Sequence, residues 1–206
     1  MKKKIYIDGQ NFLYKAADIL MGAGKITTKD ELTKIDIRAL IENIVGKDVE
    51  IVYYGAKVNV RRDLGEEIEE KTRRFSDVSR RIRNILNVQD ITFVESGKLK
   101  VRDSDVCHNC IHKDLRLQEK GVDVGIAVGM VADALQKRVD EIVLVSSDTD
   151  LLPAIDIIKT AGVTVTYIGF SNKTTRAIVA KADRTEIIRD QEILDAYDAM
   201  NGNFAD

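Results

Sequence analysis

The chain contains no tryptophan, one proline, two cysteines and two histidines among its 206 residues. The two cysteines lie in one short segment and do not make a disulfide framework, so a reducing compartment is compatible with them. No internal repeat and no linker interrupts the sequence. Hydrophobic residues make up 44% and charged residues 32% of the chain, which is typical of a folded globular protein and excludes a disordered or fibrous one.

Neither sign of charge predominates in the sequence. The net charge is −2 and the isoelectric point is about 5.8, which argues against nucleic-acid binding through bulk positive charge but leaves a local basic surface open. No apolar run approaches the ~20 residues that a transmembrane helix needs. The first residues turn polar too early for a signal peptide. We therefore expect a cytoplasmic protein that does not bind membranes.

Short apolar runs alternate with segments of helical periodicity along the chain. The expected strands are 3–8, 49–56, 91–94, 142–145, 163–168 and 186–188, and the main helices between them are 12–20, 36–45, 64–86, 120–138, 153–161 and 173–182. This alternation predicts βαβ units, and therefore a three-layer α/β/α fold with a mostly parallel central sheet. We expect one domain over residues 1–206, with a polar insert that holds cysteine and histidine at about 97–119.

Residues 141–153 are the stretch around which this fold is organised. The run Ile142 to Val145 predicts a strand buried on both faces. Two serines and the carboxylates Asp148 and Asp150 follow it, and Pro153 suits the first turn of the next helix. Open α/β sheets bind their ligands at the carboxyl ends of their strands, so we expect any chemistry to take place here.

Four aspartates are expected to converge at this edge of the sheet. Asp8 ends the first strand, Asp148 and Asp150 follow the central strand, and Asp123 opens a helix. Carboxylates brought together repel one another unless a cation neutralises them. Hard oxygen ligands without nearby cysteine or histidine favour Mg²⁺ or Mn²⁺, ions that assist phosphodiester hydrolysis. The alternative is that each aspartate simply caps the helix that follows it.

The same residues carry a resemblance to the NYN domain family, within the PIN-like nuclease superfamily. The similar segments, in family order, are Ile7–Asn11 (D-x-x-N), Glu119–Val124, Val145–Leu151, Val165–Phe170 and Ala182–Asp183. The match covers nearly the whole chain. Each motif alone is weakly specific, whereas the ordered set is fairly specific.

The resemblance implies a metal-dependent ribonuclease that binds RNA. It makes the four aspartates metal ligands, assigns Asn11 to ordering the site, and leaves Ser146 or Ser147 to hydrogen-bond a carboxylate or a phosphate. Ser147 stands where the family usually has glycine, and Leu151 where it usually has phenylalanine. Many members carry a further acid where this chain has Gly129, which favours the alternative of a catalytically inactive RNA-binding or scaffold module.

Every cysteine and histidine of the chain lies between residues 107 and 112. Cys107, Cys110 and His112 have the spacing of a zinc knuckle, so a structural zinc ion is one interpretation. The fourth ligand would come from His108, from Asp105 or Asp114, or from a second subunit in a homodimer. A redox pair and a plain solvent loop are the alternatives.

Basic residues suggest two places for RNA. Lys173 and Arg176 follow a strand at the expected active edge and are the better candidates for phosphate contacts. The long helix at 64–86 is also rich in arginine, but its acids lie four residues before its bases, which is typical of a solvated helix face. A haloacid-dehalogenase-type phosphatase is a third functional class, and Asp8-Gly-Gln-Asn lacks the second aspartate of its motif.

Overall fold

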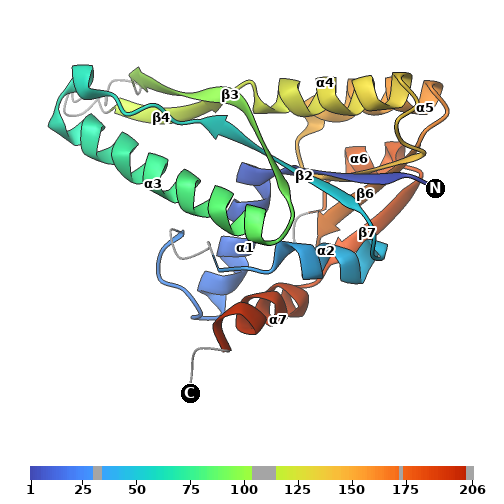
Figure 1. Ribbon diagram of the computed structural model, residues 1–206, viewed down its shortest axis with the longest axis horizontal. Coiled ribbons are helices and arrows are strands. Elements are labelled where there is room, and N and C mark those ends of the chain that lie inside the picture. The colour runs from blue at the N-terminus through green and yellow to red at the C-terminus, as the bar shows by residue number, and fades with distance from the viewer. Residues whose placement is uncertain (30–33, 104–114, 172–173, 203–206) are drawn as a thin grey trace.

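A seven-stranded sheet forms the middle of the protein in the computed structural model (Figure 1). The structure describes residues 1–29, 34–103, 115–171 and 174–202. In chain order the strands are β1 (Lys3–Asp8), β2 (Glu50–Lys57), β3 (Thr92–Asp103), β4 (Leu115–Lys120), β5 (Glu141–Val145), β6 (Thr164–Phe170) and β7 (Arg184–Ile188). They are arranged in the order β4-β3-β2-β1-β5-β6-β7, and only the β3–β4 pair is antiparallel. The predicted mostly parallel sheet is confirmed.

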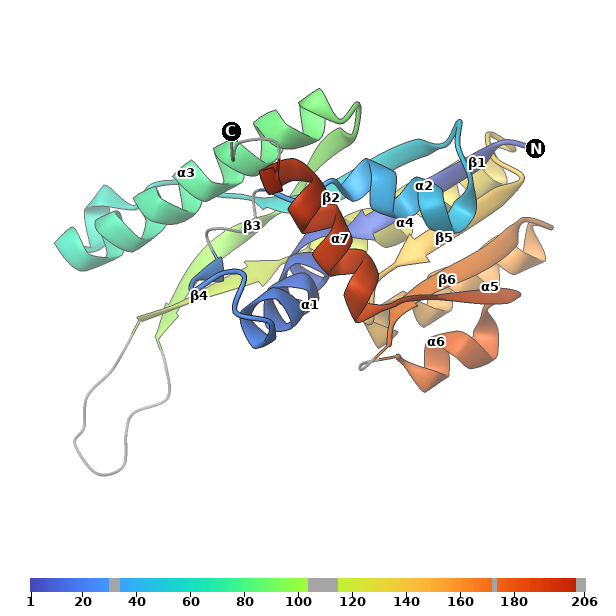
Figure 2. The same cartoon turned by 90° about the horizontal axis from the view of Figure 1, so that it is seen from below.

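Helices cover both faces of this sheet. The α-helices are α1 (Gly9–Gly22), α2 (Ile37–Val45), α3 (Glu66–Val88), α4 (Val122–Leu135), α5 (Leu152–Thr160), α6 (Arg176–Lys181) and α7 (Asp190–Asn201), and short 3-10 turns lie at η2 (Arg62–Leu64) and η3 (Thr149–Leu151). Figure 2 shows α1, α2, α3 and α7 on one side, and α4, α5 and α6 lie on the other. The three-layer α/β/α fold is therefore confirmed.

The central strands are buried because their residues are apolar on both faces. Ile5 of β1 pairs with Ile51 of β2 and Val143 of β5. Side chains of one parity, such as Ile5 and Val143, join the core under α1, α2 and α7. Those of the other parity, such as Tyr6 and Leu144, join the core under α4 and α5. Two apolar cores thus hold β1 and β5 in the middle of the sheet.

Strand β4 lies inside the segment for which a polar insert is predicted. Residues 98–103 of β3 pair with 115–120 of β4 as an antiparallel hairpin, and the residues between them, 104–114, lie outside the described part of the chain. Gly97 has a φ of +71°, and a Cβ there would lie 2.3 Å from the Lys120 carbonyl oxygen. Only glycine allows this contact, which holds the end of β4 against β3.

Pro153 lies in the first turn of α5, as the sequence predicts. Among the described residues, none of the helices is both long and apolar enough to cross a membrane.

Candidate active site at the carboxyl edge of the sheet

Three of the four predicted aspartates form one cluster. Asp148 and Asp150 follow β5, and Asp123 lies in the first turn of α4. Each offers a carboxylate oxygen, and the three oxygens lie within 4.8 Å of one another. Asp123 and Asp148 are half-buried and Asp150 is exposed. The cluster therefore opens to solvent from the carboxyl edge of the sheet.

Asp8, the fourth aspartate, lies beside this cluster with both carboxylate oxygens engaged. Its Oδ1 accepts the backbone N–H of Asn11 at 3.1 Å, which caps α1. Its Oδ2 accepts the hydroxyl of Ser146 at 2.9 Å. The Ser146 side chain is buried and its Oγ also accepts the backbone N–H of Asp148 at 3.1 Å. Ser146 thus fixes Asp8 and Asp148 relative to each other.

A second set of hydrogen bonds joins α1, the β5 loop and α6. Ser147 donates its hydroxyl to Oδ1 of Asn11 at 2.8 Å. Thr175, just before α6, donates its hydroxyl to the carbonyl oxygen of Ser147 at 3.1 Å. Arg176 begins α6 and is exposed, so it lies at the same sheet edge as the cluster.

Helix capping accounts for only part of this arrangement. Asp8 caps α1, and Asp148 caps the η3 turn through the N–H of Asp150 at 2.9 Å. Asp123 and Asp150 cap nothing: glycine occupies the N-cap of α4, and Asp150 lies inside η3. The convergence of the acids therefore goes beyond what the helix termini require.

Glu119 is an acidic residue of this site that sequence reasoning missed. It lies near the end of β4, and its pKa is raised to about 7 by burial first and then by the charges of Asp8 and Asp123. Burial also raises the pKa of Asp8, with further contributions from Asp148 and Asp123 that oppose its two hydrogen bonds. The available signal was an acid two residues before Gly121. Because this segment was assigned to a polar insert, no strand was predicted there that would turn Glu119 towards the site.

The donor set fits a hard divalent cation. Five acids lie close enough here to influence one another: Asp8, Glu119, Asp123, Asp148 and Asp150. Burial first, and then the charges of the neighbouring acids, raise the pKa values of Asp8 and Glu119, and a bound cation would oppose this repulsion. Carboxylate oxygens from Asp123, Asp148 and Asp150 are the ligands that Mg²⁺ and Mn²⁺ prefer.

Gly129, the position at which the resemblance implies a further acid, lies on α4. A Cβ at this position would lie 2.3 Å from the Tyr54 hydroxyl oxygen. The hydroxyl end of Tyr54, whose ring is stacked on that of Tyr6, thus occupies the space that a side chain at position 129 would need.

The remaining predicted residues belong to the cysteine and histidine segment and to the basic surfaces. Cys107, Cys110, His112 and Lys173 lie outside the described residues, so the zinc and the Lys173 predictions stay predictions, as does the homodimer. On α3, Glu69 pairs with Arg73 and Asp77 with Arg80. These pairs support the reading of that helix as a solvated charged face.

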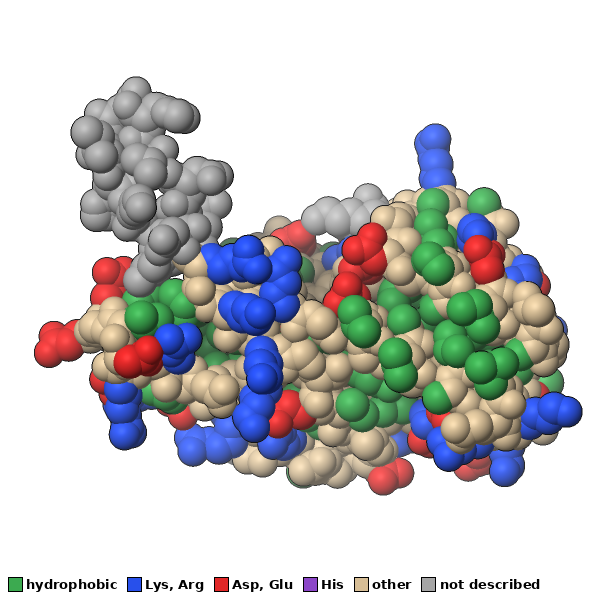
Figure 3. Space-filling view, turned by 90° about the horizontal axis from the view of Figure 1, so that it is seen from above, with side chains coloured by type: hydrophobic (Ala, Val, Ile, Leu, Met, Phe, Trp, Pro, Cys, Tyr) green, Lys and Arg blue, Asp and Glu red, His purple; other side chains and the backbone are tan. Residues whose placement is uncertain are grey.

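The hairpin adds a basic surface that the sequence analysis did not single out. Lysine and arginine side chains gather over the β3–β4 part of the molecule in Figure 3. The exposed basic residues of the hairpin are Lys98, Lys100, Arg102 and Lys120. They alternate with Leu99, Val101 and Glu119, which are less exposed. One face of the hairpin is therefore basic while the other turns towards the protein.

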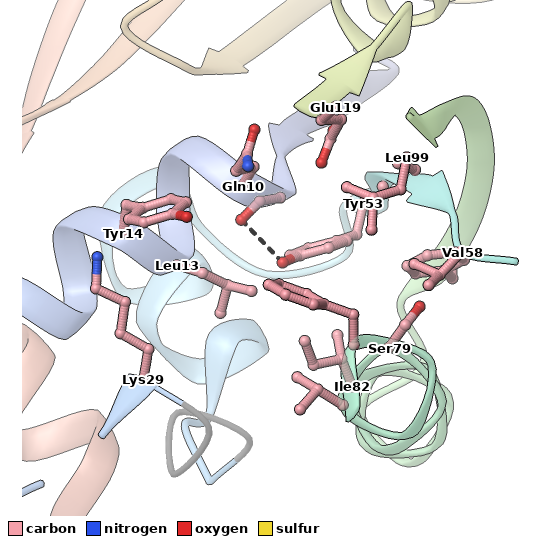
Figure 4. Close-up of a pocket in the computed structure, with 16 residues that line it drawn as sticks. Gln10, Leu13, Tyr14, Lys29, Tyr53, Val58, Ser79, Ile82, Leu99 and Glu119 are labelled. Carbon is pink, nitrogen blue, oxygen red and sulfur yellow. Dashed lines mark hydrogen bonds between the residues drawn. The ribbon is translucent and has the colours of Figure 1, made fainter. Parts of the chain in front are cut away.

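An apolar pocket of about 250 Å³ borders the acidic site (Figure 4). Gly9 and Gln10, directly after Asp8, line it together with Glu119. The remaining lining comes mostly from α1, β2, α3 and β3, with Lys29 and Val58 from outside these elements, and is largely aromatic and aliphatic. The acids and the pocket thus share one boundary.

Comparison with known proteins gives one family and a similar fold. Residues 2–189 match the model of the NYN domain. A protein of unknown function from Vibrio parahaemolyticus RIMD 2210633 has a similar structure, with a TM-score of 0.53 and 20% sequence identity over 91% of this chain and 92% of that one. At this identity the likeness shows the fold alone. No curated protein matches the chain.

Proposed function

The chain belongs to the NYN domain family of PIN-like nucleases, and on that premise we propose that it is a divalent-metal-dependent ribonuclease. The observation that carries this proposal is the cluster of Asp123, Asp148 and Asp150, whose oxygens lie within 4.8 Å of one another. Membership of the family supports the reaction class, and the cluster supports this edge of the sheet as its site.

Asp123, Asp148 and Asp150 would hold Mg²⁺ or Mn²⁺. When bound, such an ion stabilises the negative charge that develops on a phosphodiester and promotes attack by water. Asp8 would support the site beside this cluster, because hydrogen bonds from the Ser146 hydroxyl and the Asn11 N–H fix both of its carboxylate oxygens. Glu119, with a pKa of about 7, suits a group that accepts a proton and later returns it near neutral pH.

RNA would lie across the carboxyl edge of the sheet. Arg176 on one side, and Lys98, Lys100 and Lys120 on the other, are exposed and cationic. Contacts from such side chains to phosphates position a strand without reading its sequence. They also reconcile an RNA substrate with a net charge of −2.

Cleavage of end-labelled single-stranded and hairpin RNA tests the proposal. We expect cutting with Mn²⁺ or Mg²⁺, none with EDTA, and a loss of at least about a hundredfold in Asp148→Asn. Asparagine can still accept the Asp150 N–H, so the η3 turn persists. The matched control is Asp156→Asn, which removes an exposed acid on α5 whose ion pair with Lys181 contributes little.

Two outcomes would contradict this reading in different ways. Cutting that survives in Asp148→Asn would place the activity elsewhere. Wild-type protein that binds RNA without cutting would instead support a catalytically inactive RNA-binding module. The filling of the Gly129 position by Tyr54 is the feature that favours this second function.

A further inference from the structure

Two aromatic rings lie at the base of the pocket beside the acidic cluster, the partly exposed Phe93 and the buried Tyr53. Tyr53 of β2 and Phe93 of β3 stack with ring centroids 6.0 Å apart and an interplanar angle of 24°. Gly9 and Gly55 make this arrangement possible: a Cβ on Gly9 would lie 2.2 Å from the Tyr53 ring, and one on Gly55 would lie 3.0 Å from the Phe93 ring. The Tyr53 hydroxyl donates to the carbonyl oxygen of Gly9 at 3.0 Å.

The walls of the pocket keep large apolar side chains accessible. Phe75 on α3 and Tyr14 on α1 each remain 46% exposed. Figure 4 shows Tyr14 and Leu13 from α1 facing Ile82 and Ser79 from α3 across the pocket. The apolar stripe of α3 is thus only partly used in packing on the sheet. Concave apolar sites with a few polar groups are where proteins bind small planar ligands.

Two polar side chains of the pocket, Gln10 and Glu119, lie at the end next to the acidic cluster. Glu119 lines the pocket and also responds electrostatically to Asp8 and Asp123. Gln10 and Glu119 lie on the same side of the pocket in Figure 4. A ligand with an apolar planar face and a polar edge would therefore have its edge near the acids and its faces against rings.

Cations lie over two of the aromatic rings. The Lys29 ammonium is 3.8 Å from the Tyr14 ring centroid. The Arg83 guanidinium is 4.7 Å from the Phe93 ring centroid and also pairs with Glu95 at 2.8 Å. Such cations complement an anionic strand whose planar groups enter the pocket. A nucleotide combines these properties: a planar base with apolar faces and a polar edge, joined to a phosphate.

We propose that this pocket binds a nucleobase of the RNA, adjacent to the phosphodiester held at the acidic cluster. The inference rests on the proposed function and extends it, because it assigns a base-binding subsite to a surface outside the carboxylates. Since every base has an aromatic face, binding by stacking tolerates different sequences.

Fluorescence anisotropy with labelled ten-nucleotide single-stranded RNA tests the proposal. All proteins carry Asp148→Asn, which prevents cleavage during the measurement and leaves the pocket intact. We expect Phe75→Ala and Tyr14→Ala each to weaken binding by about tenfold, as loss of one stacking contact does. The control is Val88→Ala, which removes an 86% exposed apolar side chain at the end of α3, outside the pocket.

A second RNA series identifies the base. One abasic nucleotide is moved along the same RNA, and at one position it should weaken binding as much as Phe75→Ala does. At that position, the abasic nucleotide combined with Phe75→Ala should weaken RNA binding no more than either change alone, because both remove the same contact. Full additivity at every position would overturn the proposal.

Failure of the subsite and failure of the nuclease proposal give different results. If wild type binds and cuts RNA while the Phe75 and Tyr14 variants bind as tightly as Val88→Ala, the pocket does not hold a base and the nuclease reading stands. That result would point to another occupant, such as an apolar peptide. If wild type neither binds nor cuts RNA, both proposals fall.

Discussion

Replacing Glu119 by glutamine should stabilise the ion-free protein at neutral and alkaline pH. The Glu119 carboxyl has a pKa of about 7 in the folded protein, against 4.5 for the unperturbed group. The folded state therefore binds a proton more tightly than the unfolded state. As pH rises from about 4.5 to 7, wild type must ionise this carboxyl in a partly buried position and among like charges, and so loses stability, whereas glutamine does not ionise.

The pKa difference bounds the size of the effect. A shift of 2.5 units, from 4.5 to about 7, corresponds to at most ~3.4 kcal/mol at about 1.36 kcal/mol per unit. Glu119 retains some contact with solvent, which screens the repulsion, so about 1–2 kcal/mol is expected. The gain should be near zero at pH 4.5 and complete above pH 7.5.

Urea denaturation of both proteins in EDTA, at several pH values, measures this difference. The control is Glu186→Gln, an exposed carboxyl on β7, which should behave as wild type. Saturating Mn²⁺ should reduce the advantage of Glu119→Gln, because a cation neutralises the same repulsion. A stability difference that does not change with pH, or a variant less stable than wild type at pH 8, would refute the reasoning.

Other consequences of the structure are equally accessible. Gly9→Ala should lower the free energy of unfolding by roughly 1–3 kcal/mol, because its Cβ would meet the Tyr53 ring at 2.2 Å. The control Gly22→Ala, whose Cβ would have nothing within 4 Å, should not lower it, and equal urea midpoints for the two variants would contradict this prediction. Ser146→Ala should cost about 1.5–3 kcal/mol, because Asp8 loses a buried donor, and an unchanged midpoint would show that water replaces the hydroxyl. Mn²⁺ should raise the melting temperature of wild type in a concentration-dependent way, and no rise up to millimolar ion would argue against a metal site.

The fold was largely predictable because its central strands are apolar on both faces. The run from Ile142 to Val145 predicted a fully buried strand, and the aspartates after such a strand were expected at the sheet edge. β4 was not predictable in the same way. It is short, it carries the acid Glu119 on its less exposed face, and it adjoins the segment that holds every cysteine and histidine, so the sequence suggested an insert.

The candidate site was predictable in part for the same reason. Strand ends and helix starts locate Asp8, Asp123 and Asp148 from local pattern alone. Glu119 depends on a long-range event, the return of β4 beside β3, which no local pattern contains. The pocket depends on how closely α3 approaches the sheet. The periodicity of apolar residues predicts which face of a helix turns towards the sheet, but it does not predict the distance between helix and sheet.

The central position of β1 has a consequence for the order of assembly during synthesis. β1 pairs with β2 over a separation of about 46 residues, as Ile5 with Ile51, but with β5 over about 138, as Ile5 with Val143. Contacts over such separations form late, because closing the intervening chain costs entropy. Asp8 and Asp148 therefore meet only after the 140 residues that separate them have left the ribosome. A growing chain would carry the basic hairpin before it carries a complete set of carboxylates.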